Sequence, residues 1–504
     1  MIQEFAFGKL APTLQPTLFS KYSGHYLMTL INTERSNWAS RLRLDFENIR
    51  SAWQRAVHAR SALLIQPAVT PFGDYMAQFG LIPDGERLFQ EAAASFDGVD
   101  AHRELVAQLL EQQSSLTHSL HGLEAASLLQ QQMLTLTNQR ELRIKTHSNL
   151  AFYYAEIGDW KQADAHFDSI NELVDESSDI GLYIHAVESR IRVNALHFRG
   201  NFAEGIARLE GMLVLLKATP EKIADVETLH HAVLRTLSSV ATRYGDYAAA
   251  VRYSHESLAL LSELGSPRVR EQILGSIALG EEYAGLFTEA IKHHQEAIAL
   301  ALEIGDTENI GTLKTNFCLT LRQSGELEQA LIYGLEAIEI LSALGHKRIE
   351  GQARNRVGHI LLAFERWADA YAAYGDALGL WAIVQHPNRY EALAGRAVAA
   401  LRLDKHAEAL ALIDEVLDFT AENGLVGIVE PVLLLLNCET VLSEAGEAER
   451  ANNTLSQASE WVQTIADRIS DEDVRAAFLH NRPDNQRLKA RLAAFRASPT
   501  PHQA

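Results

Sequence analysis

The sequence predicts an all-α, right-handed superhelical solenoid of about ten helix-turn-helix repeats. A six-residue phrase, which starts at a turn residue and ends in Ala or Gly, recurs about every 40 residues along most of the chain. A period in this range is typical of stacked helical hairpins and not of a closed globule. The 12 prolines among 504 residues also suit a chain that is mostly helix.

The clearest copies of the phrase lie in the middle of the chain. These copies begin at Gly158, Gly245, Gly285 and Gly325. Weaker copies begin at Gly80, Leu120, Gly200, Glu365, Asp404 and Gly446. We expect each copy to reverse the chain between a helix A before it and a helix B after it, because glycine adopts the backbone conformation that such a reversal needs.

Small residues recur at two positions of each repeat. Five positions after the turn start the residues are Gly85, Ala125, Ala163, Gly205, Ala250, Ala290, Ala330, Ala370, Ala409 and Ala451. Seven positions before it, compact residues recur: Ala151, Val193, Ser238, Ala278, Cys318, Gly358 and Ala397. Helix axes approach to about 8–10 Å where the side chains at the crossing are small. Both positions are therefore predicted to lie at the A–B contact of each hairpin.

Composition and motifs exclude several functions. A formal net charge of −20 argues against direct nucleic-acid binding, because phosphates need a basic face. The sequence has no nucleophile elbow, HExxH, CxxC or GxGxxG, and its histidine pairs lack further ligands at suitable spacing. We expect no enzyme activity, cofactor or metal. Without a signal peptide or a long apolar run, a cytoplasmic protein that does not contact the membrane is expected.

The turn at residues 245–250, Gly-Asp-Tyr-Ala-Ala-Ala, carries a family resemblance. It matches the Gly-Asp-Tyr-x-x-Ala turn of the tetratricopeptide repeat (TPR). The units here exceed the usual length of about 34 residues. They resemble the longer TPR variants of bacterial regulators over residues 74–464.

Both ends of the chain resemble the sensor arm of STAND proteins, the signal-transduction ATPases with numerous domains. Residues 46–53, Phe-Glu-Asn-Ile-Arg-Ser-Ala-Trp, are similar to an early helix of that arm, and residues 466–483 are similar to its closing helix. Residues 1–10 resemble the last helix of the winged-helix module that joins the ATPase to the arm.

This resemblance implies a division of the chain into five parts. They are a winged-helix remnant at 1–20, an N-terminal helical segment at 21–73, TPR-like repeats at 74–464, capping helices at 465–496 and a disordered tail at 497–504. No Gly-x-x-x-x-Gly-Lys-[Ser/Thr] phosphate loop is present. The ATPase would then be a separate polypeptide, or the sequence retains only the sensor arm.

The TPR resemblance also implies a binding groove lined by the A helices. The expected groove residues are Arg190, Asn194, His197, Arg235, Ser239, Arg322, Asn355 and His359. Such donors would hold an anionic or peptide ligand through charge-assisted hydrogen bonds. The alternative is that these inward positions are polar because water fills the groove.

The predicted function is a non-catalytic interaction or ligand-sensing module of a bacterial signal-transduction or transcriptional regulator. Its expected partner is a protein, a peptide or a small effector in the groove, with a separate STAND ATPase or DNA-binding module as a further partner. One alternative is a free-standing TPR adaptor or scaffold. Another is a modified-TPR enzyme or a regulator that stimulates a phosphatase.

Overall fold

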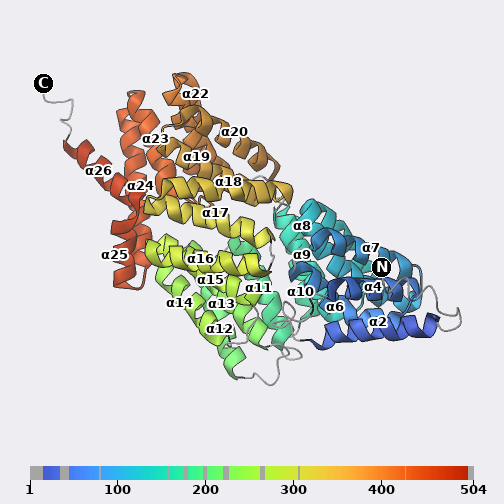
Figure 1. The fold of residues 1–504 in the computed structure, drawn as a ribbon. Helices are drawn as coiled ribbons and strands as arrows, with labels where there is room; N and C mark the ends of the chain where they lie inside the picture. Colours follow the sequence, from blue (N-terminus) through green and yellow to red (C-terminus); the bar gives the residue numbers. More distant parts are fainter. Residues whose placement is uncertain are drawn as a thin grey trace.

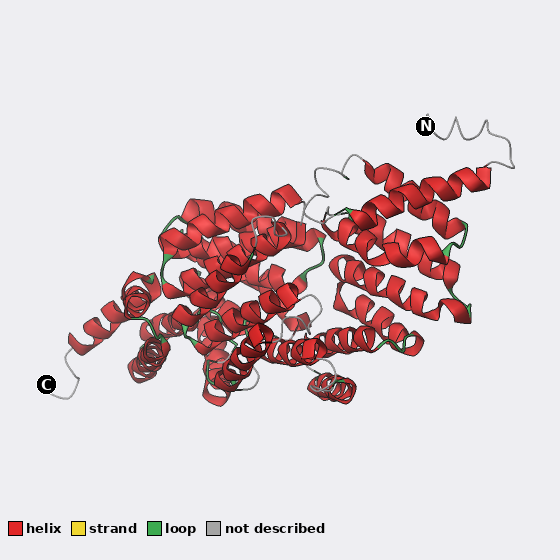
Figure 2. Cartoon of the chain, turned by 90° about the horizontal axis from the view of Figure 1, so that it is seen from below, coloured by secondary structure: helices red, strands yellow, loops and turns green. Residues whose placement is uncertain are grey.

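The computed structural model describes residues 15–33, 42, 45–78, 81–156, 159–174, 180–196, 201–218, 226–261, 267–304, 307–384, 386–425 and 427–497. Over these residues the chain folds into stacked helical hairpins with no strand (Figures 1 and 2). The all-α solenoid is thereby confirmed, and the repeat number and handedness stay predictions. None of the described helices combines the length and the apolar run that a membrane crossing requires.

The helices fall into an N-terminal group, an alternating A/B array and a C-terminal pair. The first group is α2 (Gln15–Asn32), α4 (Phe46–His58), α5 (Ala62–Ile65), η3 (Gln66–Ala68), α6 (Val69–Gln78), α7 (Ile82–Phe96), η4 (Asp100–His102) and α8 (Arg103–Leu136). The A helices are α9 (Arg140–Glu156), α11 (Ile180–Leu196), α13 (Val226–Tyr244), α15 (Pro267–Ala284), α17 (Thr307–Ser324), α19 (Lys347–Ala363), α21 (Arg389–Arg402) and α23 (Pro431–Glu444).

The B helices follow the A helices one by one. They are α10 (Trp160–Leu173), α12 (Phe202–Ala218), α14 (Tyr247–Leu260), α16 (Phe287–Ile304), α18 (Leu327–Ala343), α20 (Trp367–Val384), α22 (His406–Asn423) and α24 (Ala448–Arg468). The chain ends with α25 (Glu472–Asn481) and α26 (Pro483–Ala497). Each A helix packs on its own B helix, and successive A helices also contact one another. The A helices therefore form one continuous inner layer.

Six of the ten predicted turns adopt a positive φ, and the turn starts at Gly80, Gly158 and Gly200 lie outside the described residues. The turn glycines have φ of +99° at Gly245, +80° at Gly285, +92° at Gly325 and +82° at Gly446. The weaker copies behave alike, with φ of +58° at Glu365 and +60° at Asp404. This conformation costs a residue with a Cβ about 1–2 kcal/mol. Because Glu365 and Asp404 accept it, the hairpin geometry and not glycine alone sets these turns.

The predicted reversal near Leu120 lies inside α8. Helical geometry continues from Arg103 to Leu136, and a straight helix of that length would span about 50 Å. However, Arg103 Nη2 donates a hydrogen bond to Thr135 O at 2.7 Å, so the two ends of α8 lie side by side. Ser114 Oγ also donates to Ala126 O at 3.2 Å. The chain therefore reverses between Ser114 and Ala126, in agreement with the predicted turn.

The small residues lie where the A and B helices meet. Nine of the ten residues five positions after the turn start are buried, and Ala125 is half-buried. The seven compact residues before the turns are all buried. Cys318 and Cys438 are buried thiols with no disulfide. The winged-helix remnant predicted at 1–20 lies mostly outside the described residues, as does most of the tail predicted at 497–504.

Packing around Tyr374 gives a test of this arrangement. The buried Tyr374 ring lies between Gly358 and Gly395, where added Cβ atoms would stand 2.6 and 2.2 Å from ring carbons. Gly395→Ala should lower the free energy of unfolding by about 1–3 kcal/mol, because the enclosed ring has no room to move. Chemical denaturation of the full chain measures the change.

Gly379→Ala is the matched control. A Cβ at Gly379, in the middle of α20, would meet nothing within 4 Å. This variant should raise the free energy of unfolding by about 0.5–1 kcal/mol, because alanine favours the helix over glycine. Equal effects of the two substitutions would contradict the packing of Tyr374.

Candidate functional site

A cavity of about 900 Å³ lies inside the curve of the solenoid. One wall comes from the A helices α11, α13, α15, α17 and α19. The other wall comes from Leu425, from residues 427–430 that lead into α23, from the start of α23, and from α24 and the start of α26. The cavity therefore lies between parts of the chain that are far apart in sequence.

Arginine dominates the charges that line this cavity. The seven arginines are Arg192, Arg235, Arg243, Arg348, Arg356, Arg468 and Arg482, against the carboxylates of Glu430 and Asp484. The whole chain carries a formal charge of −20. The cavity is thus a cationic region in an acidic molecule, and its enclosing walls focus that potential.

Arg235 and Arg243 on α13 are held by neutral groups. Arg235 Nη1 donates to Gln272 Oε1 at 3.3 Å, and Arg243 Nη1 donates to Ser239 Oγ at 2.7 Å. Burial lowers the pKa of Arg243 to about 10, with a smaller contribution from Arg348. Arg235 is accessible to solvent from the cavity, yet the surrounding helices lower the pKa of its guanidinium as well. An anion between these groups would stabilise their charged forms.

Aromatic side chains give the same cavity an apolar component. They are Phe202, Tyr244, Tyr247, Tyr283, Trp381 and Trp461. Tyr247 and Tyr283 stack with ring centroids 5.7 Å apart. Such side chains bury large apolar areas while their polar atoms make hydrogen bonds. The site therefore suits a ligand that carries both negative charge and apolar groups.

The C-terminal helices return to the middle repeats, where α25 packs on α14 and α15 (Figure 1). Arg468 Nη1 donates to Tyr244 O at 2.7 Å, and its guanidinium lies 4.9 Å from the Tyr244 ring centroid. Asn481 Nδ2 donates to Gly285 O at 3.0 Å. These bonds cap two A helices at their C-terminal ends, where backbone carbonyls lack helical partners. The C-terminal segment thus contacts distant repeats, and its role as a cap of the last repeat stays a prediction.

Two buried ion pairs position this return. Arg482 Nη1 lies 3.4 Å from Glu282 Oε1, and the Glu282 side chain is fully buried. Arg322 pairs with Glu430, and Gln323 Nε2 donates to Asp484 Oδ2 at 3.1 Å. Buried charges need their partners in one geometry, because an unpaired buried charge is strongly destabilising. The pairs therefore select one docked position.

The structure divides the predicted groove residues among three environments. Arg235 and Ser239 line the cavity, and Arg190 and Asn194 line a separate pocket of about 140 Å³. Arg322, Asn355 and His359 instead contact other parts of the protein. His197 lies outside the described residues. Ligand contact at any of the eight residues stays a prediction.

The positions of the A helices that line the cavity differ from one repeat to the next, for a physical reason. Glu430 and Asp484 contact Arg322 and Gln323 near the end of α17, and Glu430 also lies beside His359 of α19, so these TPR positions are covered. The cavity is lined instead by Arg348, Gln352 and Arg356, which share one face of α19 at a spacing of four. This spacing of four could have identified these residues from the sequence, but the TPR register selected other positions of the same helix.

No protein-family model and no curated protein matches the chain. The solved structures that match this chain include a Rap protein complexed with competence and sporulation factor (13% identity, 70% of this chain, 99% of that chain, TM-score 0.43). They also include NprR in complex with its cognate peptide NprX (15% identity, 70% of this chain, 98% of that chain, TM-score 0.44). A putative kinesin light chain of TPR-like repeats from Podosopora anserina matches over a shorter length (14% identity, 38% of this chain, 95% of that chain, TM-score 0.31).

The Arg482–Glu282 pair gives a test of the closed arrangement. Arg482→Met should lower the free energy of unfolding by about 3–5 kcal/mol, because it leaves the buried Glu282 carboxylate without its cation. Arg402→Met is the control, because Arg402 and Glu444 form an exposed pair with 38% and 42% side-chain exposure. That change should be below about 1 kcal/mol. Similar losses measured by chemical denaturation would show that the return of α26 does not depend on this pair.

Proposed function

We propose that the protein is a non-catalytic sensing module that binds an acidic, partly apolar peptide segment in its central cavity. The observation that supports this is the excess of arginine over carboxylate along the cavity wall in a chain of net charge −20. A volume of about 900 Å³ lies at the upper end of the range of about 300–1,000 Å³ for ligand pockets. It suits a short segment of several residues better than a small metabolite.

The physical basis of recognition would be local. An acidic segment is repelled by the outer surface and attracted only where several guanidinium groups converge inside low-dielectric walls. Arg235 and Arg243 would form charge-assisted hydrogen bonds with its carboxylates. The aromatic side chains would cover its apolar groups. Specificity then requires both features in one ligand.

Ligand binding would also bias the shape of the solenoid. The cavity is lined both by the A helices and by the C-terminal helices that return to them. A ligand that contacts both walls binds the closed arrangement better than an open one, and therefore shifts the population toward it. This is how occupancy of the cavity would be transmitted to a partner.

We place this module in a STAND-type regulator, with the domain division at residues 20, 73, 464 and 496 as part of the same proposal. The support is the similarity of residues 46–53 and 466–483 to the two ends of a sensor arm. A free-standing adaptor is the alternative. Co-purification of the chain with a phosphate-loop ATPase from its native cells supports the first and contradicts the second.

A fluorescein-labelled peptide of alternating glutamate and leucine tests the ligand class. The full chain should bind it, and affinity should fall as salt rises, because the attraction is electrostatic. Arg235→Ala should weaken binding by about 1.5–3 kcal/mol, the usual contribution of a hydrogen bond to a charged group. Fluorescence anisotropy measures both effects.

Two controls separate cavity binding from surface attraction. Arg389→Ala removes an exposed arginine that pairs with Glu415 and does not line the cavity, and it should leave binding unchanged. A lysine–leucine peptide of the same length should bind the acidic outer surface without sensitivity to Arg235→Ala. Equal weakening by Arg235→Ala and Arg389→Ala would refute the cavity as the binding site.

A further inference from the structure

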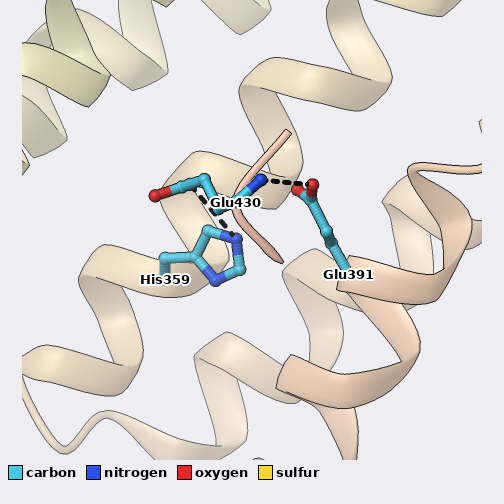
Figure 3. A group of neighbouring side chains, drawn as sticks. All are labelled: His359, Glu391 and Glu430. Atoms are coloured by element: carbon cyan, nitrogen blue, oxygen red, sulfur yellow. Dashed lines mark hydrogen bonds and ion pairs between the residues drawn. The ribbon is translucent and has the colours of Figure 1, made fainter. Parts of the chain in front are cut away.

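Three buried ligand-type side chains meet behind the cavity wall, and they come from three different elements (Figure 3). His359 lies on α19, Glu391 lies on α21, and Glu430 directly precedes α23. One potential ligand atom from each residue lies within 4.8 Å of the others. Each residue is only 4–5% exposed. The cluster is therefore enclosed by protein and shares Glu430 with the cavity wall.

The imidazole of His359 is oriented into this cluster. Its Nδ1 lies 2.7 Å from the hydroxyl of Tyr374, and its Nε2 lies 3.8 Å from Glu430 Oε2. Within the part of the chain that the structure describes, Nε2 has no hydrogen-bond partner. A buried polar atom in that state costs about 1–3 kcal/mol. A neutral imidazole is the form that binds metals.

Each carboxylate in the cluster has one oxygen held by the protein. Glu391 Oε1 accepts hydrogen bonds from the backbone N–H groups of Val429 and Glu430, the latter at 2.8 Å. Glu430 Oε1 accepts from Arg322 and from Gln323, the latter at 3.1 Å. Their second oxygens are the atoms left to act as ligands. Outer contacts of this kind orient carboxylate and imidazole ligands in metal sites.

The charges around the cluster leave one carboxyl group without a guanidinium. Glu430 pairs with Arg322, and Asp484 lies 3.8 Å from the same guanidinium. Glu282 pairs with Arg482. The hydrogen bonds of Glu391, in contrast, come from backbone N–H groups. A cation at the cluster would therefore stabilise the charged form of this buried carboxyl group.

We propose that His359 Nε2 and one oxygen each of Glu391 and Glu430 bind a single divalent transition-metal ion of the Zn²⁺ class. Zinc takes imidazole and carboxylate ligands at about 2.0–2.2 Å, so ligand atoms in a tetrahedral site lie about 3.4 Å apart. The 3.8 Å between His359 Nε2 and Glu430 Oε2 is close to that spacing. The nitrogen ligand favours Zn²⁺ over Mg²⁺ and Ca²⁺, which prefer oxygen.

The ion would have a structural role beside the cavity. It would join α19, α21 and the segment before α23, and Val429 and Glu430 of that segment line the cavity. Metal binding would therefore hold one wall in place. This inference does not depend on the nature of the cavity ligand, because only Glu430 of its three ligands lines the cavity and the proposed recognition of that ligand does not use Glu430.

Isothermal titration of the chelator-treated full chain with Zn²⁺ alone tests the site. We expect one ion per chain, and a Zn²⁺-dependent rise in the thermal unfolding temperature, because the metal binds only the folded arrangement. Glu391→Gln keeps the carbonyl that accepts from Val429 and Glu430, so it preserves the fold while it removes the anionic ligand. It should weaken Zn²⁺ binding at least about tenfold. His359→Gln should do the same.

His255→Gln is the matched control, because His255 lies near a different carboxylate, 3.9 Å from Glu281 Oε1, and is largely exposed. It should leave the stoichiometry and affinity unchanged. Circular dichroism verifies that each variant is folded. Absence of Zn²⁺ binding to the wild-type chain overturns the proposal, as does binding that Glu391→Gln and His359→Gln leave intact. Loss of the ion in His255→Gln alone would place the site at Glu281 and also overturns it.

Discussion

The closed form of this solenoid depends on how closely the C-terminal helices approach two turn glycines. A Cβ at Gly285 would lie 2.8 Å from the carbonyl oxygen of Ala477, and one at Gly245 would lie 2.6 Å from Ile465 Cδ1. Both glycines also have positive φ. The turns at Gly325 and Gly446 share the φ, but an added Cβ there meets nothing within 4 Å. Glycine at 285 is thus required both by its own backbone and by the backbone carbonyl that meets it, whereas at 245 the positive φ is the stronger requirement.

Closure changes the chemistry of the inner face. An open groove would present the A helices to water, where exposed arginines contribute little to binding. Once α24 and α26 lie opposite α13 and α15, the same arginines share an enclosed space with aromatic rings. Electrostatic attraction is stronger in such a space, because the surrounding protein lowers the effective dielectric constant. The tertiary arrangement thereby turns scattered cations into one site.

A set of buried ion pairs, in which Arg322 pairs with Glu430 and Asp484 and Arg482 pairs with Glu282, connects these features. It holds the C-terminal helices in register, and Glu430 belongs both to the cavity wall and to the cluster with His359 and Glu391. Networks of this kind stabilise only when every member is satisfied. Among the described residues, His359 Nε2 has no hydrogen-bond partner, and the same holds for Arg322 Nε, Gln323 Oε1 and Glu282 Oε2 around it. A buried polar atom without a hydrogen-bond partner is the place to look for a ligand or an ion.

The sequence by itself determined the hairpins, because their contacts are short in range. An Ala or Gly at the crossing and a left-handed turn act within one repeat of about 40 residues, so even the turns at Glu365 and Asp404 could be predicted. The cavity-lining positions Arg235 and Ser239 of α13 were found by counting back from the turn glycine in the same repeat. The absence of metal-binding spacing led to the expectation of no metal, since His359, Glu391 and Glu430 share no motif.

Only the tertiary structure decided which inward positions remain open and what meets behind them. Arg468 contacts a residue 224 positions away, and Arg482 contacts one 200 positions away. Whether such segments meet depends on small rotations that accumulate from repeat to repeat, and these rotations leave no local pattern in the chain. The cavity, its charge and the buried cluster are products of that accumulated curvature.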